Sequence, residues 1–147
     1  MSYTIYLSGE IHSDWREQIK QGILDNQLDI EVLTPITDHD ASDNVGSNIL
    51  GTEANAFWKD HKAAKINSLR TNSFISRSDI IIVKFGDKYK QWNAAFDAGI
   101  ATGLGIPIIT LHSGDLTHPL KEIDASALAV TETPSQVIEI LKYISQP

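Results

Sequence analysis

The chain of 147 residues contains no cysteine, which excludes disulfide bonds, thiolate catalysis and thiolate-bound metals. It also lacks any apolar stretch near the roughly 20 residues that a membrane-spanning helix needs. The N-terminal residues show neither the charged nor the apolar region of a secretory signal peptide. We therefore expect a protein that has no membrane partner and is located in the cytoplasm.

Basic residues are scarce as well. The 12 Lys and Arg residues face 19 Asp and Glu residues, which gives a formal net charge of −7. Such a field repels phosphate backbones, so we expect no nucleic-acid partner, although a local basic group can still hold a small anion. The histidines are scattered without metal-ligand spacing, and the acidic segment 38–43 lacks the spacing of a calcium loop. The sequence therefore implies no metal and no bound cofactor.

Apolar runs alternate with helical patterns along the chain, which predicts βαβ units. Right-handed crossovers then give an α/β fold with a doubly wound, mostly parallel five-stranded sheet, flavodoxin-like or Rossmann-like, with helices on both faces. We expect the strand order 2-1-3-4-5 and a single domain over residues 1–147. The expected strands are 3–7, 30–33, 79–85, 106–111 and 127–131. The expected helices are 14–26 with Ser13 as N-cap, 53–77 with a break near Asn72, 91–104, and 134–145 with Thr133 as N-cap.

Residues 37–52 form a polar, acidic segment with several glycines. Such a segment is too long for an idle connection in so compact a chain. Two interpretations stay open, a lid over the ligand cleft or a disordered surface loop.

Ligands of open α/β sheets bind beyond the carboxyl ends of the strands, where the strand order switches. The segments 6–13, 85–91 and 111–114 are expected there. Backbone N–H groups of the Gly9 turn lie beside a helix N-terminus that favours negative charge, and His12 and Arg16 add donors. The alternative is an ordinary glycine turn with a capped helix. The missing three-glycine fingerprint disfavours a nicotinamide dehydrogenase.

The expected helix 91–104 carries a candidate catalytic carboxylate. Asn93 and Asp97 share one face of it, beside an apolar stripe formed by Trp92, Ala95, Phe96, Gly99 and Ile100. Burial among small and apolar neighbours raises the pKa of Asp97, whereas the helix dipole and any hydrogen-bond donor lower it. If the lowering wins, Asp97 is ionised at neutral pH and can attack an electrophilic carbon. The alternative is a solvent-facing aspartate on an amphipathic helix.

Three motifs follow one another along the chain: Tyr6-Leu7-Ser8-Gly9-Glu10-Ile11, then Ser78-Asp79-Ile80-Ile81-Ile82-Val83, then Ala95-Phe96-Asp97-Ala98-Gly99-Ile100-Ala101 with Gly105-Ile106-Pro107-Ile108-Ile109. In order and spacing they resemble the motifs of the nucleoside 2-deoxyribosyltransferase superfamily, and more closely those of its small YtoQ-type branch. The resemblance runs from residue 3 to about residue 112.

This resemblance implies base exchange or hydrolysis at the anomeric carbon of a (deoxy)nucleoside or nucleotide through a covalent glycosyl-enzyme. It assigns the nucleophile to Asp97, its steering to the Tyr6 hydroxyl, close ligand approach to Gly9, and holding or protonation of the base to Asp79. It also implies a homo-oligomer, for which Phe57, Trp58 and Trp92 are contact candidates. Other candidates for substrate binding are Ser8, Glu10, His12, Arg16, Asp87, Gln91, Asn93, His112 and Ser113.

Two departures from the family pattern keep other functions open. Asp97 stands where the family usually has glutamate, which shortens the reach by roughly 1.5 Å, and a misplacement of about 1 Å can cost a hundredfold in rate. Gln91 stands where the family commonly has a sugar-binding aspartate, and it brings no charge. The alternatives are a nucleoside- or nucleotide-binding module without turnover, and a structural or interaction domain with an empty cleft.

Overall fold

The computed structural model describes residues 2–147 and consists of two compact units. The first unit comprises the residues up to Thr34 together with Ile75–Pro147, and the second comprises Pro35–Phe74. No helix within the described range is long and apolar enough to cross a membrane. The single-domain organisation over residues 1–147 stays a prediction.

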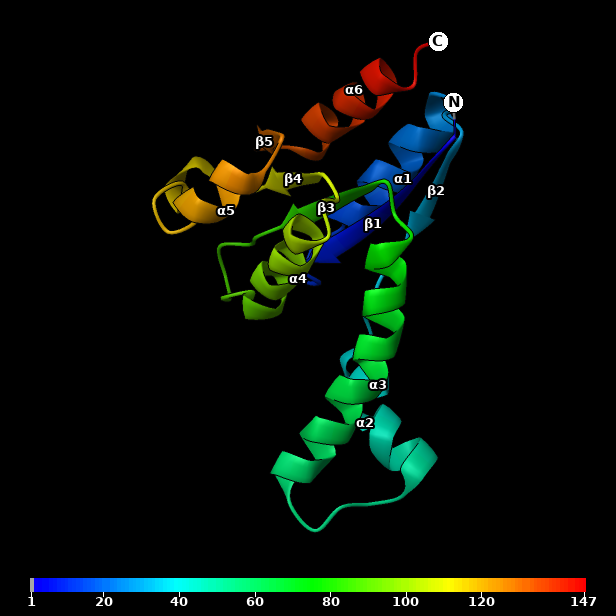
Figure 1. Ribbon diagram of the computed structural model, residues 1–147, viewed down its shortest axis with the longest axis vertical. Helices are drawn as coiled ribbons and strands as arrows, with labels where there is room; N and C mark the ends of the chain where they lie inside the picture. Colours follow the sequence, from blue (N-terminus) through cyan, green and yellow to red (C-terminus); the bar gives the residue numbers. More distant parts are fainter. Residues whose placement is uncertain (1) are drawn as a thin grey trace. The chain divides into compact units, whose positions relative to one another are not determined.

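The first unit is built on a five-stranded parallel sheet in the order β2-β1-β3-β4-β5 (Figure 1). This confirms the doubly wound class and the predicted strand order. The order reverses between β1 and β3, so the ligand-binding edge expected for such sheets lies beyond the last residues of these two strands. The strands are β1 (Tyr3–Gly9), β2 (Ile30–Leu33), β3 (Ile80–Lys84), β4 (Ile108–Leu111) and β5 (Ala129–Thr131).

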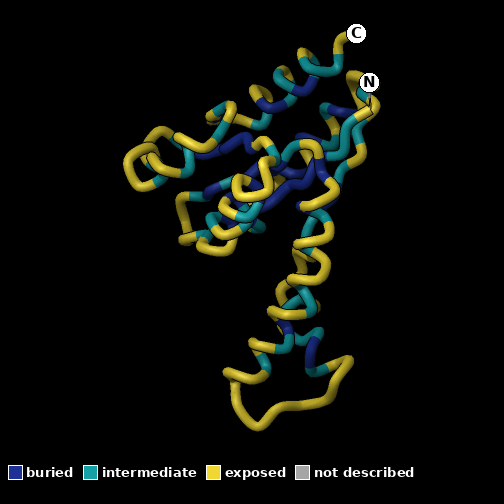
Figure 2. The backbone as a smooth tube through the Cα atoms, viewed as in Figure 1, coloured by how far each residue is buried: buried dark blue, intermediate teal, exposed yellow. Residues whose placement is uncertain are grey.

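Helices cover both faces of this sheet. Because side chains alternate along a strand, Ile5 and Leu7 point to one face and Ser8 to the other. On the first face, α1 (Trp15–Asp25) and α6 (Pro134–Ile144) enclose an apolar core, and the buried strands stand out in dark blue in Figure 2. The remaining elements of this unit are α4 (Trp92–Gly103), η1 (Gly114–Leu116) and α5 (Lys121–Ser126), and α4 packs on the opposite face.

The helix starts were predicted with mixed success. α6 begins as expected, because Thr133 forms a capping box with Gln136 and Pro134 occupies the first turn. The predicted N-cap of α1 is wrong. Asp14 occupies that position without a side-chain cap, and the Ser13 hydroxyl instead donates to the Glu10 carboxylate at 2.6 Å.

The second unit contains α2 (His39–Leu50) and most of α3 (Ala56–Ser76). A helix over 39–50 shows that the segment 37–52 is not a disordered surface loop, whereas its interpretation as a lid stays a prediction. The Asp38 side chain accepts from the Ala41 N–H at the start of α2, and Gly51 ends the helix with a φ of 90°. The buried Gly46 lets the two helices approach closely, since a Cβ there would lie 2.7 Å from Cβ of Lys62.

The long helix α3 runs without the break predicted near Asn72. Neither glycine nor proline occurs between its ends, so nothing in its backbone chemistry interrupts the hydrogen-bond ladder. The polar residue Asn72 is exposed and therefore costs the helix little.

Candidate functional site

Asp97 lies on the side of α4 that faces the sheet. The Ser8 hydroxyl of β1 donates to Oδ2 of Asp97 across 2.6 Å, and Ser8 itself is only 1% exposed. The alternative of a solvent-facing aspartate is therefore wrong. The pair joins the last residues of β1 to the middle of α4, beside the point where the strand order switches.

The hypothesis that the helix dipole and hydrogen-bond donors lower the pKa of Asp97 by more than burial raises it is not supported by the structure. Burial raises the pKa of Asp97 above its ordinary value, and the hydrogen bond from Ser8 lowers it by less. The negative charge on this carboxylate is thus costly in the folded protein. A costly, partly desolvated carboxylate is also a reactive one, because its charge is not dispersed by water.

The apolar stripe predicted on this helix lies on its outer side. Small residues face the sheet, where Ala94, Ala98 and Ala101 are buried. By contrast, Trp92 is 76% and Phe96 67% exposed. Small side chains let a helix lie close to a sheet, and that closeness is what brings the short Asp97 side chain to Ser8.

The turn between β1 and α1 is organised by the side chain of Glu10, which is 7% exposed. Its carboxylate accepts from the backbone N–H of His12 and, at 2.6 Å, from the hydroxyl of Ser13. The Glu10 carbonyl accepts from the indole N–H of Trp15 at 2.7 Å. Glu10 therefore accepts hydrogen bonds from three donors of the same turn and of the start of α1.

Arg16 was predicted as a donor to a ligand, and the structure ties it to the backbone instead. Its guanidinium donates to the carbonyls of Leu7, Gly9 and Glu10 over 3.1, 3.1 and 2.6 Å, and the residue is 5% exposed. Burial lowers the pKa of Arg16 to about 10, while Tyr6 and Glu10 oppose the shift. Arg16 fixes the shape of the turn.

The loop from β3 to α4 closes against this turn. The backbone N–H of Gly86 donates to Oε1 of Gln91 at 2.9 Å. A Cβ at Gly86 would lie 2.6 Å from Cγ of Glu10, so the loop is in close contact with the Glu10 side chain. The side chain of Gln91 was predicted to bind a sugar, but its amide oxygen accepts a hydrogen bond from the loop.

Two further contacts join loops at the carboxyl edge of the sheet. The Ser113 hydroxyl donates to Oδ1 of Asp87 at 2.7 Å and links the segments that follow β3 and β4. The rings of His12 and Tyr89 lie 4.8 Å apart between centroids. Sequence reasoning missed Tyr89, although an aromatic residue just beyond a strand end was a usable signal.

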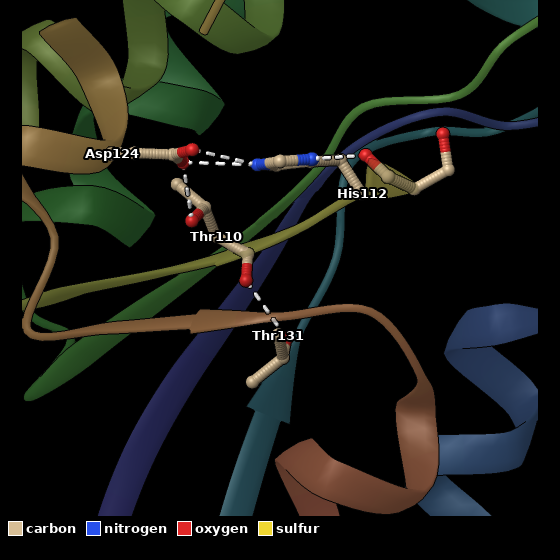
Figure 3. A network of polar contacts seen from close by, with 5 residues as sticks. Thr110, His112, Asp124 and Thr131 are labelled. Atoms are coloured by element: carbon tan, nitrogen blue, oxygen red, sulfur yellow. Dashed lines mark hydrogen bonds and ion pairs between the residues drawn. The ribbon is translucent and has the colours of Figure 1, made fainter. Parts of the chain in front are cut away.

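The predicted substrate-binding residue His112 is 1% exposed and belongs to a buried polar network (Figure 3). Its Nδ1 lies 2.6 Å from the Ser113 carbonyl, and its Nε2 lies 2.9 Å from Oδ2 of Asp124 in α5. Thr110 also donates to Asp124, at 2.8 Å. With both ring nitrogens engaged, His112 joins β4 to α5 and is not presented to a substrate.

We expect Asp124→Ala to destabilise the protein by about 3 kcal/mol, because it leaves a buried imidazole and the Thr110 hydroxyl without their acceptor. Urea unfolding monitored by circular dichroism measures the loss. Asp115→Ala, at an exposed position of η1, is the matched control and should cost little. Equal stability of the two variants would show that the network contributes nothing.

Asp79 is not brought to Asp97. It precedes β3, where its Oδ2 accepts from the Thr4 N–H at 2.7 Å. Strand pairing sets Ile80 opposite Ile5 and Lys84 opposite Gly9, so Asp79 lies at the amino edge, roughly 13 Å or more from the Gly9 end. The predicted role in handling the base is therefore not supported by its position.

The other two predicted residues lie nearer to the carboxylate. Tyr6 precedes Ser8 by two residues on the same face of β1 and is 1% exposed. Asn93 is exposed one helical turn before Asp97. Within residues 2–147 no group of three or more His, Cys, Asp or Glu residues is arranged to hold a metal ion.

Comparison with known proteins gives a consistent result. A family model described as "Nucleoside 2-deoxyribosyltransferase YtoQ" matches residues 6–145. The protein YtoQ of Bacillus subtilis (strain 168) is 44% identical over 144 residues, which cover 98% of this chain and 97% of that protein.

Solved structures share the fold at low sequence identity. A 2-deoxyribosyltransferase of Bacillus psychrosaccharolyticus superposes with a TM-score of 0.55 at 19% identity, covering 92% of this chain and 90% of that one. The Clostridium botulinum CMP N-glycosidase BcmB superposes with a TM-score of 0.54 at 14% identity, covering 96% and 98%. The first is named as a 2-deoxyribosyltransferase and the second as an N-glycosidase.

Proposed function

The chain belongs to the nucleoside 2-deoxyribosyltransferase YtoQ family, and we propose that it transfers or hydrolyses the N-glycosidic bond of a (deoxy)nucleoside or nucleotide with Asp97 as nucleophile. The observation that carries this proposal is the desolvated Asp97 carboxylate, held by Ser8 beside the switch in strand order. The chemistry needs neither a metal nor a bound cofactor. We expect the reaction to take place in the cytoplasm.

The proposed reaction is a double displacement. Oδ2 of Asp97 is held by Ser8, so Oδ1 attacks C1′ of the sugar. An O–C1′ bond forms as the C1′–N bond breaks, and the base leaves with the electron pair and takes up a proton. A second base or water then attacks C1′ and releases the carboxylate. The charge of Asp97 stabilises the oxocarbenium-like transition state in both steps.

The direct test is release of free base from purified protein incubated with nucleosides and 5′-nucleotides, resolved by liquid chromatography. A slow substrate should also leave a mass adduct of one sugar on the peptide that contains Asp97. The rival function, a binding module, predicts saturable calorimetric binding with no base released over hours. That outcome would overturn the enzymatic proposal.

Replacing Ser8 by alanine should change the pKa of Asp97 while leaving the Asp97 side chain in place. The Ser8 hydroxyl lowers the pKa of that carboxylate, so its loss raises the pKa further. Since the ionised form attacks, the acid limb of the rate profile should move to higher pH, and kcat at neutral pH should fall about tenfold. Thr131→Val, which removes a buried hydroxyl on β5, is the control. An unmoved acid limb in Ser8→Ala would contradict the prediction.

The exposed aromatic face of α4 supports a homo-oligomer. Trp92 and Phe96 lie one turn apart and are both mostly exposed, and each can bury about 150–250 Å² in a contact. We expect a dimer or larger assembly by analytical ultracentrifugation, and Phe96→Asp should shift it toward the monomer. Tyr143→Asp, at an exposed position on α6, should not. A monomeric wild-type protein at tens of micromolar would refute the assembly.

A further inference from the structure

The outer side of α4 carries a stripe with large side chains at one end and bare backbone at the other. Its members follow one another at intervals of four, three and four residues, which places them on one side of the helix: Trp92, Phe96, Gly99 and Gly103. Trp92 is 76% and Phe96 67% exposed, and both glycines are exposed. Asp97, the only charged residue of α4, faces the sheet instead. The stripe is therefore uncharged and aromatic, a composition typical of the core of an interface.

The fold of the single chain does not explain the two glycines. Seven of the nine glycines have either a positive φ or a neighbouring atom within 4 Å of the place where a Cβ would lie. Gly99 and Gly103 have neither. Glycine is also a poor helix former, so alanine would suit α4 better at both positions. The bare backbone therefore indicates that something outside the chain packs closely against it.

We propose that α4 of a second copy packs antiparallel against this stripe. Trp92 then lies over the partner's Gly103. Phe96 lies over the partner's Gly99, and two-fold symmetry makes each contact twice. One antiparallel register satisfies both contacts, because the two pairs of positions share one midpoint along α4. The bare glycines let the two helix axes approach to about 8 Å, the close end of the usual range.

The observations favour a second copy as the occupant of this face. The bulky half of the stripe matches its own bare half, as a two-fold contact between identical surfaces requires. Each copy carries a net charge of −7, so an uncharged face is where two copies meet with the least repulsion. The four aromatic side chains of a pair bury about 600 Å² or more, roughly half of the 1,200 Å² at the lower end of stable interfaces. The inference rests on the assembly proposed above and names the partner of its contact face.

The first experiment fills the bare half of the stripe and measures dimer formation of the whole protein by sedimentation velocity. Gly99→Leu has open space in the single chain, so far-UV circular dichroism should show an intact fold. In the pair the new side chain meets the partner's Phe96, and the dimer Kd should rise at least about tenfold. Thr102→Leu, which adds the same side chain at an exposed position of α4 beside the stripe, is the control and should leave the Kd unchanged. Equal effects of the two substitutions, a monomeric wild type at tens of micromolar, or an assembly with an odd number of copies would each overturn the proposal.

The second experiment exchanges the two sides of one contact. Phe96→Gly removes the bulky side and Gly99→Phe fills the bare side, so each substitution alone should weaken the pair. Both positions are exposed, so neither change alters the core. Combined in one chain, the two substitutions again set a large side chain opposite a bare backbone, and the dimer should form at least about tenfold more tightly than with either alone. A double variant as weak as the single ones would overturn the antiparallel register.

Base release by the wild-type protein is followed in parallel, so that the two proposals can fail separately. Pairing that obeys both experiments without any base release would overturn the proposed enzymatic function and leave the α4 pair standing. Base release from a protein that stays monomeric would overturn the pair and leave the enzymatic function standing.

Discussion

Asp97→Asn is expected to abolish base release, with kcat reduced at least about a thousandfold. An amide oxygen carries no charge and is a poor nucleophile, so neither the glycosyl-enzyme nor the stabilised oxocarbenium state can form. Steady-state release of base, measured by liquid chromatography, checks this. Asp29→Asn, which changes an exposed carboxylate immediately before β2, is the control and should keep full activity. Undiminished turnover in Asp97→Asn would mean that another group attacks.

The same substitution should stabilise the protein at neutral pH. Burial raises the pKa of Asp97 in the folded state above its unfolded value, so the folded state binds more protons. The wild-type protein therefore loses stability as the pH rises from about 4 through the folded pKa. The amide that Asp97→Asn introduces does not titrate, so the thermal midpoint of the variant should exceed that of the wild type at pH 7 but not near pH 3. A lower midpoint at pH 7 would show that the charge is favourable.

The reach of Asp97 connects the fold with the proposed chemistry. An aspartate is shorter than the usual glutamate by one methylene, which the sequence suggests as a defect. In the structure the buried alanines of α4 let this helix pack closely on the sheet, and Asp97 reaches Ser8 at 2.6 Å. A short acid on a closely packed helix can thus be as well positioned as a longer one. Base release by the wild-type protein decides whether this compensation suffices.

The sheet was predictable because its signals are local. The run Ile80-Ile81-Ile82-Val83 is typical of a strand covered on both faces, and it is the central β3 of the structure. The helix over residues 39–50 was not recognised, although Asp38 as N-cap and Gly51 at its end were readable signals. The polar composition of this segment favoured a loop over a helix. A helix can nevertheless form there, because α2 packs through a narrow contact at Gly46 and needs no broad apolar face.

The candidate site was predicted less completely because its contacts are long-range. The periodicity of α4 indicated an apolar stripe beside Asp97 but did not show that Trp92 and Phe96 face outward, since only the folded sheet demands small residues on the packed side. Residue type alone could not show that His112 pairs with Asp124 on a different element. For Asp79, the strand was recognised correctly, but the residue lies at the opposite edge from the site.

Gly9→Ala is expected to destabilise the protein by about 4 kcal/mol or more, an exceptional loss for one methyl group. Gly9 has a φ of +112°, which L-residues rarely adopt, and a Cβ there would lie 2.1 Å from the carbonyl oxygen of Lys84 on β3. That carbonyl also accepts from the Glu10 N–H at 3.0 Å, so β1 and β3 cannot separate without losing the turn.

Chemical denaturation measures the loss, and Gly103→Ala on α4 is the control, because a Cβ there meets nothing within 4 Å. The resemblance explained Gly9 by the close approach of a ligand. In the structure, a side chain at this position is excluded by the neighbouring strand β3 instead. The two explanations differ in outcome. A Gly9→Ala protein of wild-type stability that has lost ligand binding would restore the ligand explanation, and a protein that unfolds at much lower urea establishes the structural one.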